Sequence, residues 1–405
     1  MDTSIKVSEY QARRKKINAA LKDSIGLVFA GDGAPPLRGE WFPDMNFRYL
    51  TGIANEPGAV VLFDPTNPNP KRRTILFLKP VNPEMDVWDG YRDHISQELR
   101  DRYGFETVMR TLSLPRFLTD AARRTKKLAC LHPTAAYTQP LTHDLDIFQK
   151  VAARMPGCAI IDKSDTIISQ RLVKSTAEIK QITTAIKATH NGLNRLLAKL
   201  KPGVGERELH NALVGGFAEA GSIRNAFDPI VGSGHNATVL HYKENAGVCN
   251  DGELVVVDSG AEINGYASDI TRTFPVSGKF TKEQAKLYNI VLKSQQEAIK
   301  AVKPGATMAQ VDEASRKVIR DAGYGDQYMH GVGHHLGLET HDPSPEVKLK
   351  PGMVVTIEPG IYLQDQSIGI RIEDDILVTE SGNRNLSSMI PKTVAEVEAA
   401  IKQAK

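Results

Sequence analysis

Short apolar runs alternate with helical stretches over the first 165 or so residues. The apolar runs are GLVFAG, GAVVLF, TILFLK, KLACLH and CAIID. Each has the length of a strand, and the alternation with helices predicts an α/β domain built on a mostly parallel sheet. The segment TNPNPKRR at 66–73 is expected to be a turn-rich connection because it is dominated by Pro, Asn and basic residues.

A long amphipathic helix is predicted to follow this first domain. It begins at STAEIKQI, where Ser175 and Glu178 have the spacing of a capping box. The boundary is therefore expected near residues 165–174. We predict an N-terminal α/β domain over residues 1–170 and a second domain over residues 171–405.

The second domain contains an approximate internal repeat. The matching segments are 200–221 with 302–323, GSGH (232–235) with GVGH (331–334), and ELVVVDSG (253–260) with MVVTIEPG (353–360). Each half reads as a helix, a KPG turn, a second helix, a glycine-rich turn and strands. We therefore predict an α+β domain made of two halves about a pseudo-twofold axis.

Acidic residues stand at corresponding strand ends in the two halves. The repeat aligns Asp258 with Glu358, and a second pair follows, Asp269 and Glu373. The turn AEING lies between Asp258 and Asp269, and it predicts a hairpin that brings these two acids face to face. In IGIRIEDDILV, alternation places Arg371 on the same strand face as Glu373. Buried carboxylates at strand ends are costly unless they are paired or bind a metal.

Histidines are concentrated in the segment HGVGHHLGLETHD at 330–342, which holds four of the eleven in the chain. Its glycines argue against a long regular helix, so a tight backbone path is expected to carry His330 and His334 into a site. The repeat also aligns His241 with His341. The spacing differs from the usual zinc-binding pattern because position 331 is Gly.

Four carboxylates and one imidazole on a rigid sheet suit a pair of divalent cations. An oxygen-rich ligand set of this kind favours Mn²⁺, Co²⁺ or Fe²⁺ over a sulfur- or histidine-rich zinc site, although Zn²⁺ can use the same ligands. Two such ions would hold a bridging water as hydroxide at neutral pH. The expected reaction class is hydrolysis of an amide or a similar acyl bond.

The amino-acid composition indicates which classes of partner and which cellular compartment to expect. The 405 residues include 51 basic and 48 acidic side chains, a balance that gives no reason to expect nucleic acid or a membrane surface. Three scattered cysteines without C-x-x-C spacing indicate a reducing compartment. The N-terminus has no apolar signal-peptide region. A cytoplasmic protein is expected.

Seven blocks of the sequence resemble one known family. They are FRYLTGIANEPGAVVLF, VWDG, FDPIVGSGHNATVLHY, VVVDSGAEINGYASDITRTFP, HGVGHHLGLETHD, TIEPGIY and GIRIEDDILVTESG. They resemble the metallopeptidases of the creatinase/aminopeptidase ("pita-bread") fold, most closely the aminopeptidase P family. The resemblance implies a creatinase-like N-terminal domain with a mixed sheet and helices, followed by a catalytic pita-bread domain.

The resemblance also implies roles for individual residues. The metal ligands would be Asp258, Asp269, His334, Glu358 and Glu373, with Asp269 and Glu373 bridging two ions, Mn²⁺ first among the candidates. Glu358 would in addition move a proton from the nucleophilic water to the leaving nitrogen.

Other residues would line the site or bind substrate. His330 would line it, Arg371 would stand beside the bridging glutamate, and His241 and His341 would bind the substrate carbonyl. Trp88 and Tyr362 are packing residues by default, but the resemblance places them in the substrate pocket, with Trp88 supplied across a subunit contact. His335 stands where relatives often carry an aromatic residue.

The implied activity is cleavage of an N-terminal Xaa-Pro bond in peptides that carry proline at the second position, by a protein that forms dimers or tetramers. One alternative is a prolidase, which has the same site and cleaves Xaa-Pro dipeptides. Another is a non-catalytic pita-bread binding protein. A methionine aminopeptidase would not need the first 165 residues.

Overall fold

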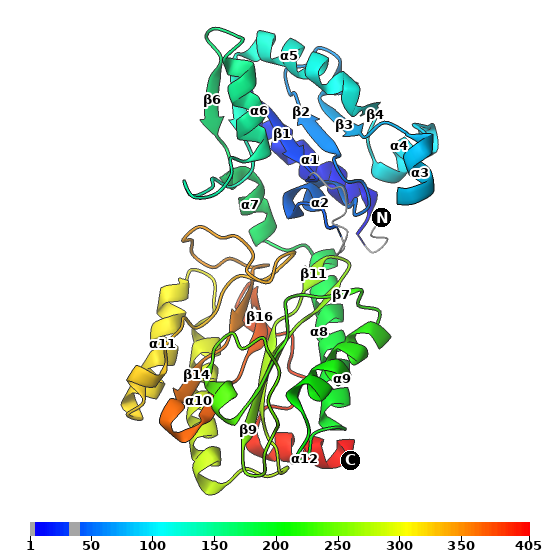
Figure 1. The fold of residues 1–405 in the computed structure, drawn as a ribbon. Coiled ribbons are helices and arrows are strands. Elements are labelled where there is room, and N and C mark those ends of the chain that lie inside the picture. The colour runs from blue at the N-terminus through cyan, green and yellow to red at the C-terminus, as the bar shows by residue number, and fades with distance from the viewer. Residues whose placement is uncertain (1–4, 32–40) are drawn as a thin grey trace. The chain divides into compact units, whose positions relative to one another are not determined.

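The structure is a computed structural model that describes residues 5–31 and 41–405. The chain divides into two compact units, Met1–Arg171 and Leu172–Lys405 (Figure 1). Each unit has a sheet system and a core of its own.

A six-stranded sheet forms the centre of the first unit. Its strands, in spatial order, are β4 (Thr107–Arg110), β3 (Thr74–Leu78), β2 (Val60–Phe63), β1 (Ile25–Phe29), β5 (Lys127–Cys130) and β6 (Ala159–Asp162). The sheet is mixed, because β2 runs antiparallel to both β1 and β3, whereas the β3–β4, β1–β5 and β5–β6 pairs are parallel. Three of the five pairings are parallel, and the mixed sheet implied by the family resemblance is present, but the apolar runs alone did not indicate that β2 is antiparallel. The connection after β2 is only a turn-rich loop, too short for a helical crossover, so β3 folds back as a hairpin.

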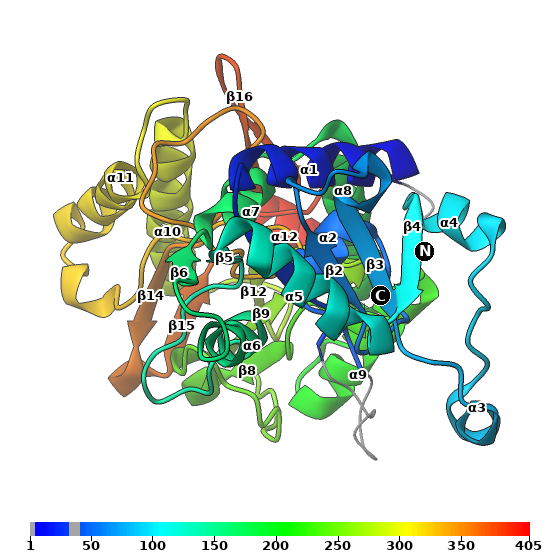
Figure 2. The ribbon, with the colours of Figure 1, turned by 90° about the horizontal axis from the view of Figure 1, so that it is seen from above.

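Seven α-helices accompany this sheet among the described residues of the first unit. They are α1 (Val7–Leu21), α2 (Met45–Thr51), α3 (Pro83–Asp89), α4 (Gln97–Tyr103), α5 (Leu114–Thr125), α6 (His143–Ala152) and α7 (Asp165–Leu172), with 3₁₀ turns at Pro70–Arg72 and Thr111–Ser113. Ile25 and Leu27 share one face of β1 and form a core with residues of α5 and α6 (Figure 2). Leu21 of α1 lies against the opposite face, beside Gly26. The two-residue period of a strand accounts for this division.

Arg14 of α1 joins the ends of two short helices. Its buried guanidinium donates to the carbonyl of Leu50 in the last turn of α2 at 2.7 Å and to that of Gly104, just after α4, at 2.5 Å. The carbonyl ends of helices carry partial negative charge, so they stabilise a cation there. Burial lowers the pKa of Arg14 to about 9.

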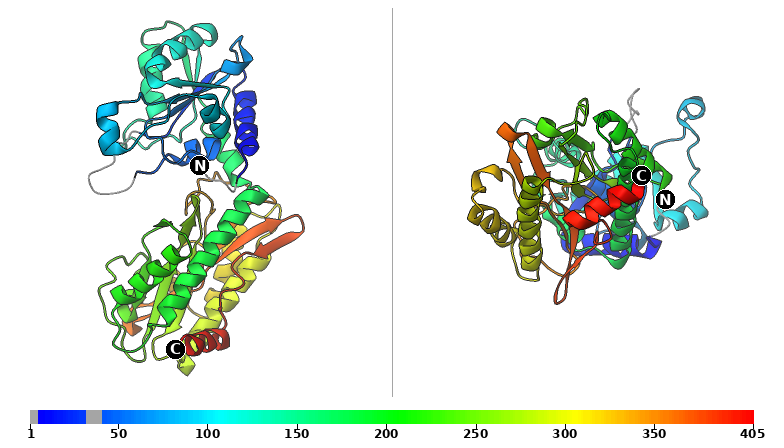
Figure 3. Two further views of the ribbon diagram at one scale, coloured as in Figure 1. Left: turned by 90° about the vertical axis from the view of Figure 1, so that its right-hand side faces the viewer. Right: turned by 90° about the horizontal axis from the view of Figure 1, so that it is seen from below.

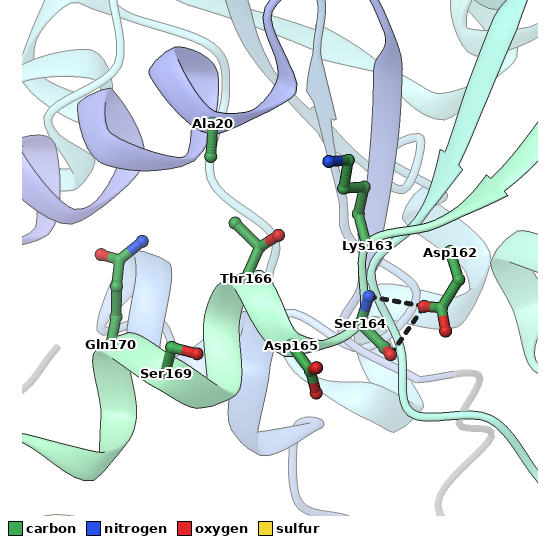
Figure 4. A pocket seen from close by; sticks show the side chains of 8 residues that line it. All are labelled: Ala20, Asp162, Lys163, Ser164, Asp165, Thr166, Ser169 and Gln170. Atoms are coloured by element: carbon green, nitrogen blue, oxygen red, sulfur yellow. Dashed lines mark hydrogen bonds between the residues drawn. The ribbon is translucent and has the colours of Figure 1, made fainter. Parts of the chain in front are cut away.

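A shallow polar hollow of about 570 Å³ lies at the start of α7 (Figure 4). Asp162 accepts hydrogen bonds from the backbone N–H of Ser164 at 2.8 Å and from its hydroxyl at 2.7 Å. These bonds form the turn from β6 into α7, so the polar lining of the hollow has a structural explanation.

The second unit contains five α-helices and four small sheets among its described residues. The helices are α8 (Thr176–Leu197), α9 (Glu206–Glu219), α10 (Lys282–Ala301), α11 (Met308–Asp321) and α12 (Val394–Ala404), with 3₁₀ turns η3 (Gly234–Thr238), η4 (Gly325–Gln327) and η5 (Gln364–Gln366). The sheets are β11–β10–β7 (Tyr266–Ala267, Ala261–Ile263, Arg224–Asn225), β12–β9–β8 (Ile270–Pro275, Leu254–Ser259, Ile230–Ser233), β13–β16–β17 (Val354–Ile357, Asp374–Thr379, Gly382–Asn385) and β14–β15 (Gly360–Leu363, Ile368–Arg371).

The order of elements confirms the predicted repeat. Helix α8 packs on α9 and α10 packs on α11, and in Figure 1 the two pairs lie on opposite sides of the strands. Strand β9 pairs antiparallel with β12 in one half, as β13 does with β16 in the other. The predicted capping box of Ser175 and Glu178 is present at the start of α8. Helix α12 packs against α8 and α10 (Figure 3).

A buried ion cluster fixes the start of β16. The guanidinium of Arg272 donates to Asp374 Oδ1 at 2.8 Å and to the carbonyl oxygen of Glu373 at 2.6 Å, and Lys392 Nζ lies 2.5 Å from Asp374 Oδ2. Arg272 and Asp374 are fully buried. The backbone at Glu373 is thus held from behind by charged groups that cannot move without breaking a buried pair. None of the described helices combines the length and the apolar character needed to cross a bilayer.

Candidate metal centre

Two antiparallel strand pairs bring the four acids to one place. Asp258 of β9 faces Thr271 of β12, and the linking turn at Asn264 and Gly265 has φ values of 54° and 90°. Positive φ at both turn residues is the geometry of a tight hairpin, as predicted for AEING. In the other half, Ile357 pairs with Asp374, which brings Glu358 and Glu373 together at the ends of β13 and β16.

The segment that carries His334 runs alongside β13. The backbone N–H of Thr356 donates to the carbonyl of His334 at 2.8 Å, and that of Glu358 donates to the carbonyl of Val332 at 2.8 Å. Gly333 between them has a φ of +154°, and a Cβ there would lie 2.0 Å from the carbonyl oxygen of Thr356. Only glycine permits this close approach, so the glycines of the segment place the histidine at the strand end, without a helix.

Asp269, His334 and Glu373 form the centre of the cluster. One ligand atom from each lies within 4.8 Å of the others. His334 Nε2 is 3.4 Å from Asp269 Oδ2 and 3.7 Å from Glu358 Oε1. Its Nδ1 lies 3.1 Å from the carbonyl oxygen of His335. A carbonyl can only accept, so Nδ1 carries the proton and the lone pair of Nε2 points toward the carboxylates, as in a metal-binding histidine.

Asp258 has one oxygen occupied and one free. Its Oδ2 accepts from Arg371 Nη2 at 2.6 Å, whereas its buried Oδ1 has no hydrogen-bond partner within the described part of the chain. A buried carboxylate oxygen without a donor is costly in free energy. A cation next to the neighbouring acids would satisfy it, so Asp258 fits a metal ligand.

The acids of the cluster raise one another's pKa. Burial, together with the charges of Asp258 and Glu358, raises the pKa of Asp269 well above its ordinary value. Burial and the charge of Asp269 do the same for Glu373, and burial raises the pKa of Glu358 to about 7. Like charges in a desolvated space cannot all ionise without a compensating cation. The cluster therefore favours binding of protons or metal ions.

Arg371 connects the acids to the residues behind them. Besides Asp258, its guanidinium donates to Thr271 Oγ1 at 3.2 Å and to the Tyr362 hydroxyl at 2.8 Å. The hydroxyl of Thr271 in turn donates to Glu373 Oε2 at 2.7 Å. Thr271 was not among the predicted residues. The alternation in DITRT, which places Thr271 on the same strand face as Asp269, is the signal that could have identified it.

His330 lies beside the cluster, supported by Tyr362. Its Nδ1 is 2.8 Å from the carbonyl oxygen of Gly331 and its Nε2 is 2.9 Å from the Tyr362 hydroxyl. The hydroxyl therefore donates to Nε2 and accepts from Arg371. Burial lowers the pKa of His330 to about 4, so the ring is neutral. Tyr362 is only 3% exposed, which makes it a support for His330 and leaves it little surface for a ligand.

The remaining predicted residues are exposed. The ring of His341 stacks on that of His334, with centroids 3.7 Å apart and an interplanar angle of 16°. Partial burial of the ring is the main cause that lowers the pKa of His341. Trp88 lies in α3 of the first unit, where it is 83% exposed.

Comparison with known proteins agrees with this description. A family model described as "Metallopeptidase family M24" matches residues 180–380, and one described as "Aminopeptidase P, N-terminal domain" matches residues 10–129. A Xaa-Pro aminopeptidase of Haemophilus influenzae is 33% identical over 432 residues, which cover 96% of each chain. The solved structure of aminopeptidase PepP from Pseudomonas aeruginosa is similar with a TM-score of 0.88 and 31% identity over 99% of each chain.

Part of the chain also matches a dipeptidase. A Xaa-Pro dipeptidase of Pyrococcus furiosus is 39% identical over 233 residues, which make up 55% of this chain and 65% of the relative.

Fold and site together are those of a metallopeptidase. Because the similarity extends over both units, the chain belongs to metallopeptidase family M24, in its aminopeptidase P group.

The raised pKa values predict how the metal-free protein responds to pH. A carboxyl group whose pKa is higher in the folded chain binds more protons there than when unfolded, so stability falls as pH rises. For Glu358 this loss occurs between its ordinary pKa of 4.5 and about 7. From pH 5.5 to 8.0, the free energy of unfolding should fall by about 2 kcal/mol through Glu358. Urea titrations of the metal-stripped protein at the two pH values measure this free energy of unfolding.

The matched control is Glu358→Gln, which removes this titration and should reduce the pH dependence, while Asp269 and Glu373 still contribute their part. Saturating Mn²⁺ should reverse the loss in the parent protein, because the ion replaces the proton. An equal slope in the parent and the variant would contradict the pKa assigned to Glu358.

Proposed function

We propose that this protein is a two-metal aminopeptidase that hydrolyses the bond between the first residue of a peptide and a proline at the second position. The observation that carries the proposal is the cluster of acids around His334, in which one ligand atom each of Asp269, His334 and Glu373 lies within 4.8 Å of the others. Relatives that match along both units and are named Xaa-Pro aminopeptidases support the substrate class.

Asp258, Asp269, His334, Glu358 and Glu373 would hold two divalent ions, with Mn²⁺ preferred and Co²⁺, Fe²⁺ or Zn²⁺ as alternatives. The unpaired Oδ1 of Asp258 and the lone pair of His334 Nε2 support this assignment. When bound, such ions act as Lewis acids and supply hydroxide near neutral pH.

Glu358 is proposed to move the proton. With a pKa raised to about 7, its carboxylate can take a proton from the attacking water and deliver it to the proline nitrogen as the bond breaks. An Xaa-Pro bond has no amide N–H, so an enzyme cannot hold it through that group. Delivery of a proton to the nitrogen is therefore the step that the chain must supply.

Histidines are proposed to hold the substrate carbonyl. His341, which stacks on His334, and His241 both have exposed side chains, whose N–H groups would donate to the carbonyl oxygen as negative charge develops on it. His330 remains neutral, held by Tyr362 and Arg371, and lines the site. Tyr362 and Arg371 act through His330 and Asp258 and need no contact with substrate.

The alternative is a prolidase, which cleaves only Xaa-Pro dipeptides. The Pyrococcus furiosus dipeptidase favours it, because this chain is 39% identical to that enzyme over 233 residues. That match covers 55% of this chain, whereas the Haemophilus influenzae aminopeptidase matches 96%. The fuller match favours the aminopeptidase.

The oligomeric state and the compartment are also proposals. The segment that contains Val87, Trp88 and Tyr91 is 75–92% exposed, which supports burial of these side chains in a dimer or tetramer. Trp88 could then line a pocket of a neighbouring subunit. Three free thiols, Cys130, Cys158 and Cys249, support a reducing compartment such as the cytoplasm.

Peptide length separates the two activities. With Mn²⁺ restored to the metal-stripped protein, Ala-Pro-Ala should release alanine at a kcat/KM at least tenfold above that for Ala-Pro, because the aminopeptidase reading requires no group to hold a C-terminal carboxylate. Chromatography of the products measures both. Cleavage of Ala-Pro alone would establish the prolidase, and cleavage of neither with any of the four ions would contradict the proposal.

Substitution of the proton carrier gives a second test. Glu358→Gln should lower kcat on Ala-Pro-Ala by about 10³-fold, within the range expected for loss of a general acid and base. Glu380→Gln, an exposed acid in the same unit, is the matched control and should leave kcat unchanged. If Glu358→Gln retains both its metal ions and the parent kcat, Glu358 is not the proton carrier.

A further inference from the structure

The same hydrogen bond occurs in both halves of the catalytic unit. In each half, an acid near the start of the second helix accepts the backbone N–H of the second residue in the glycine-rich turn. Glu206 Oε1 accepts from Ser233 at 2.8 Å, and Asp312 Oδ1 accepts from Val332 at 2.9 Å. Ser233 and Val332 are equivalent in the alignment of GSGH with GVGH. Neither acid belongs to the proposed metal or substrate residues.

Glu206 is a fully buried carboxylate that holds both ends of one loop. Besides Ser233, it accepts from Asn236 Nδ2 at 3.0 Å, the Tyr242 hydroxyl at 2.8 Å and the backbone N–H of Gly247 at 2.7 Å. No cationic side chain pairs with it among the described residues. A carboxylate has about four acceptor sites, and these four donors can occupy them.

His241 lies on this loop, next to Tyr242. Its own side chain is exposed, so the position of its ring depends on the backbone that carries it. The loop also packs against β15 through η3, where a Cβ at Gly369 would lie 1.9 Å from the carbonyl oxygen of Ala237. Glu206 thus fixes in advance a loop that would otherwise lose conformational entropy when substrate binds.

Asp312 performs the equivalent task for the turn that carries His330 and His334. Its Oδ2 lies 2.6 Å from Arg316 Nε, and Arg316 donates to the carbonyl of His330 at 2.6 Å. Helix α11 therefore holds this turn at an N–H and at a carbonyl. The carbonyl groups of Val332 and His334 accept from β13, so the turn is fixed on both sides.

We propose that Glu206 and Asp312 are the paired positioning residues of the two halves, with different tasks: Glu206 positions His241 for substrate, and Asp312 positions His334 for metal. The assignment rests on the proposed function, because His241 and His334 have these roles only there. It follows that the two substitutions should affect different measurements.

The test compares Glu206→Gln with Asp312→Asn. Glu206→Gln should leave the Mn²⁺ affinity of the metal-stripped protein within twofold of the parent, and at saturating Mn²⁺ should lower kcat/KM on Ala-Pro-Ala at least tenfold. Asp312→Asn should weaken Mn²⁺ affinity about 10–100-fold, the range for loss of a group that orients a metal ligand, and regain most activity at saturating Mn²⁺. Isothermal titration with Mn²⁺ alone and steady-state kinetics measure these effects.

Two further variants keep the test sound. Glu219→Gln changes an exposed acid on α9 that pairs with Arg195, and should alter neither measurement. Tyr242→Phe removes only one donor to Glu206, so it should give a smaller loss of kcat/KM with unchanged Mn²⁺ affinity even if Glu206→Gln fails to fold. Equal Mn²⁺ weakening by Glu206→Gln and Asp312→Asn, or no effect of Tyr242→Phe on kcat/KM, would overturn the division of tasks.

Hydrogen exchange distinguishes this inference from the proposed function. Glu206→Gln should raise amide exchange at Ser233 and Gly247 by at least tenfold, and Asp312→Asn should do so at Val332, whatever the substrate. The parent protein could cut no Xaa-Pro peptide while the variants still show faster amide exchange and different Mn²⁺ affinities. In that case the proposed function fails, but the positioning roles of Glu206 and Asp312 stand. Unchanged amide exchange in both variants would refute the positioning roles of Glu206 and Asp312.

Discussion

The mutual repulsion of buried carboxylates is the constraint on which the catalytic unit depends. Asp258, Asp269, Glu358 and Glu373 meet at strand ends where burial raises the pKa of the last three. An apolar core would be more stable than this cluster in the absence of a cation. Divalent ions that replace protons offset the free-energy cost of burying these carboxylates, because the free energy of ion binding stabilises the folded state. Metal binding and the stability of this unit are therefore linked.

The fold resists this repulsion through supports that lie behind the acids. Arg272 and Asp374 form a fully buried pair at the start of β16, and Arg371 holds Asp258 from one side. Backbone pairing of His334 with Thr356 adds the imidazole to a strand end. Each of these side chains is thus positioned by a strand or by a buried ion pair, which leaves little freedom for the acids to move apart. A rigid site of this kind favours specific geometry over adaptability.

Local chemistry explains which features the sequence could predict. The hairpin at Asn264 and Gly265 and the capping box at Ser175 depend on neighbouring residues, and both are present. The element order of the repeat was also readable, because duplication preserves it. The antiparallel direction of β2 was not readable from the apolar runs, because strand direction depends on how each connection packs. Nor was Glu206, which has a partner 41 residues away. Side-chain bonds across such separations leave no periodic signal.

The most direct test of the central claim is a crystal structure of the Mn²⁺-loaded protein with anomalous diffraction at the manganese edge. The account predicts two anomalous peaks per chain within bonding distance of Asp258, Asp269, His334, Glu358 and Glu373. Asp258 Oδ1, now without a partner, should be one of the bonded atoms. A single peak, or peaks that leave Asp258 Oδ1 unbound, would contradict the two-metal site.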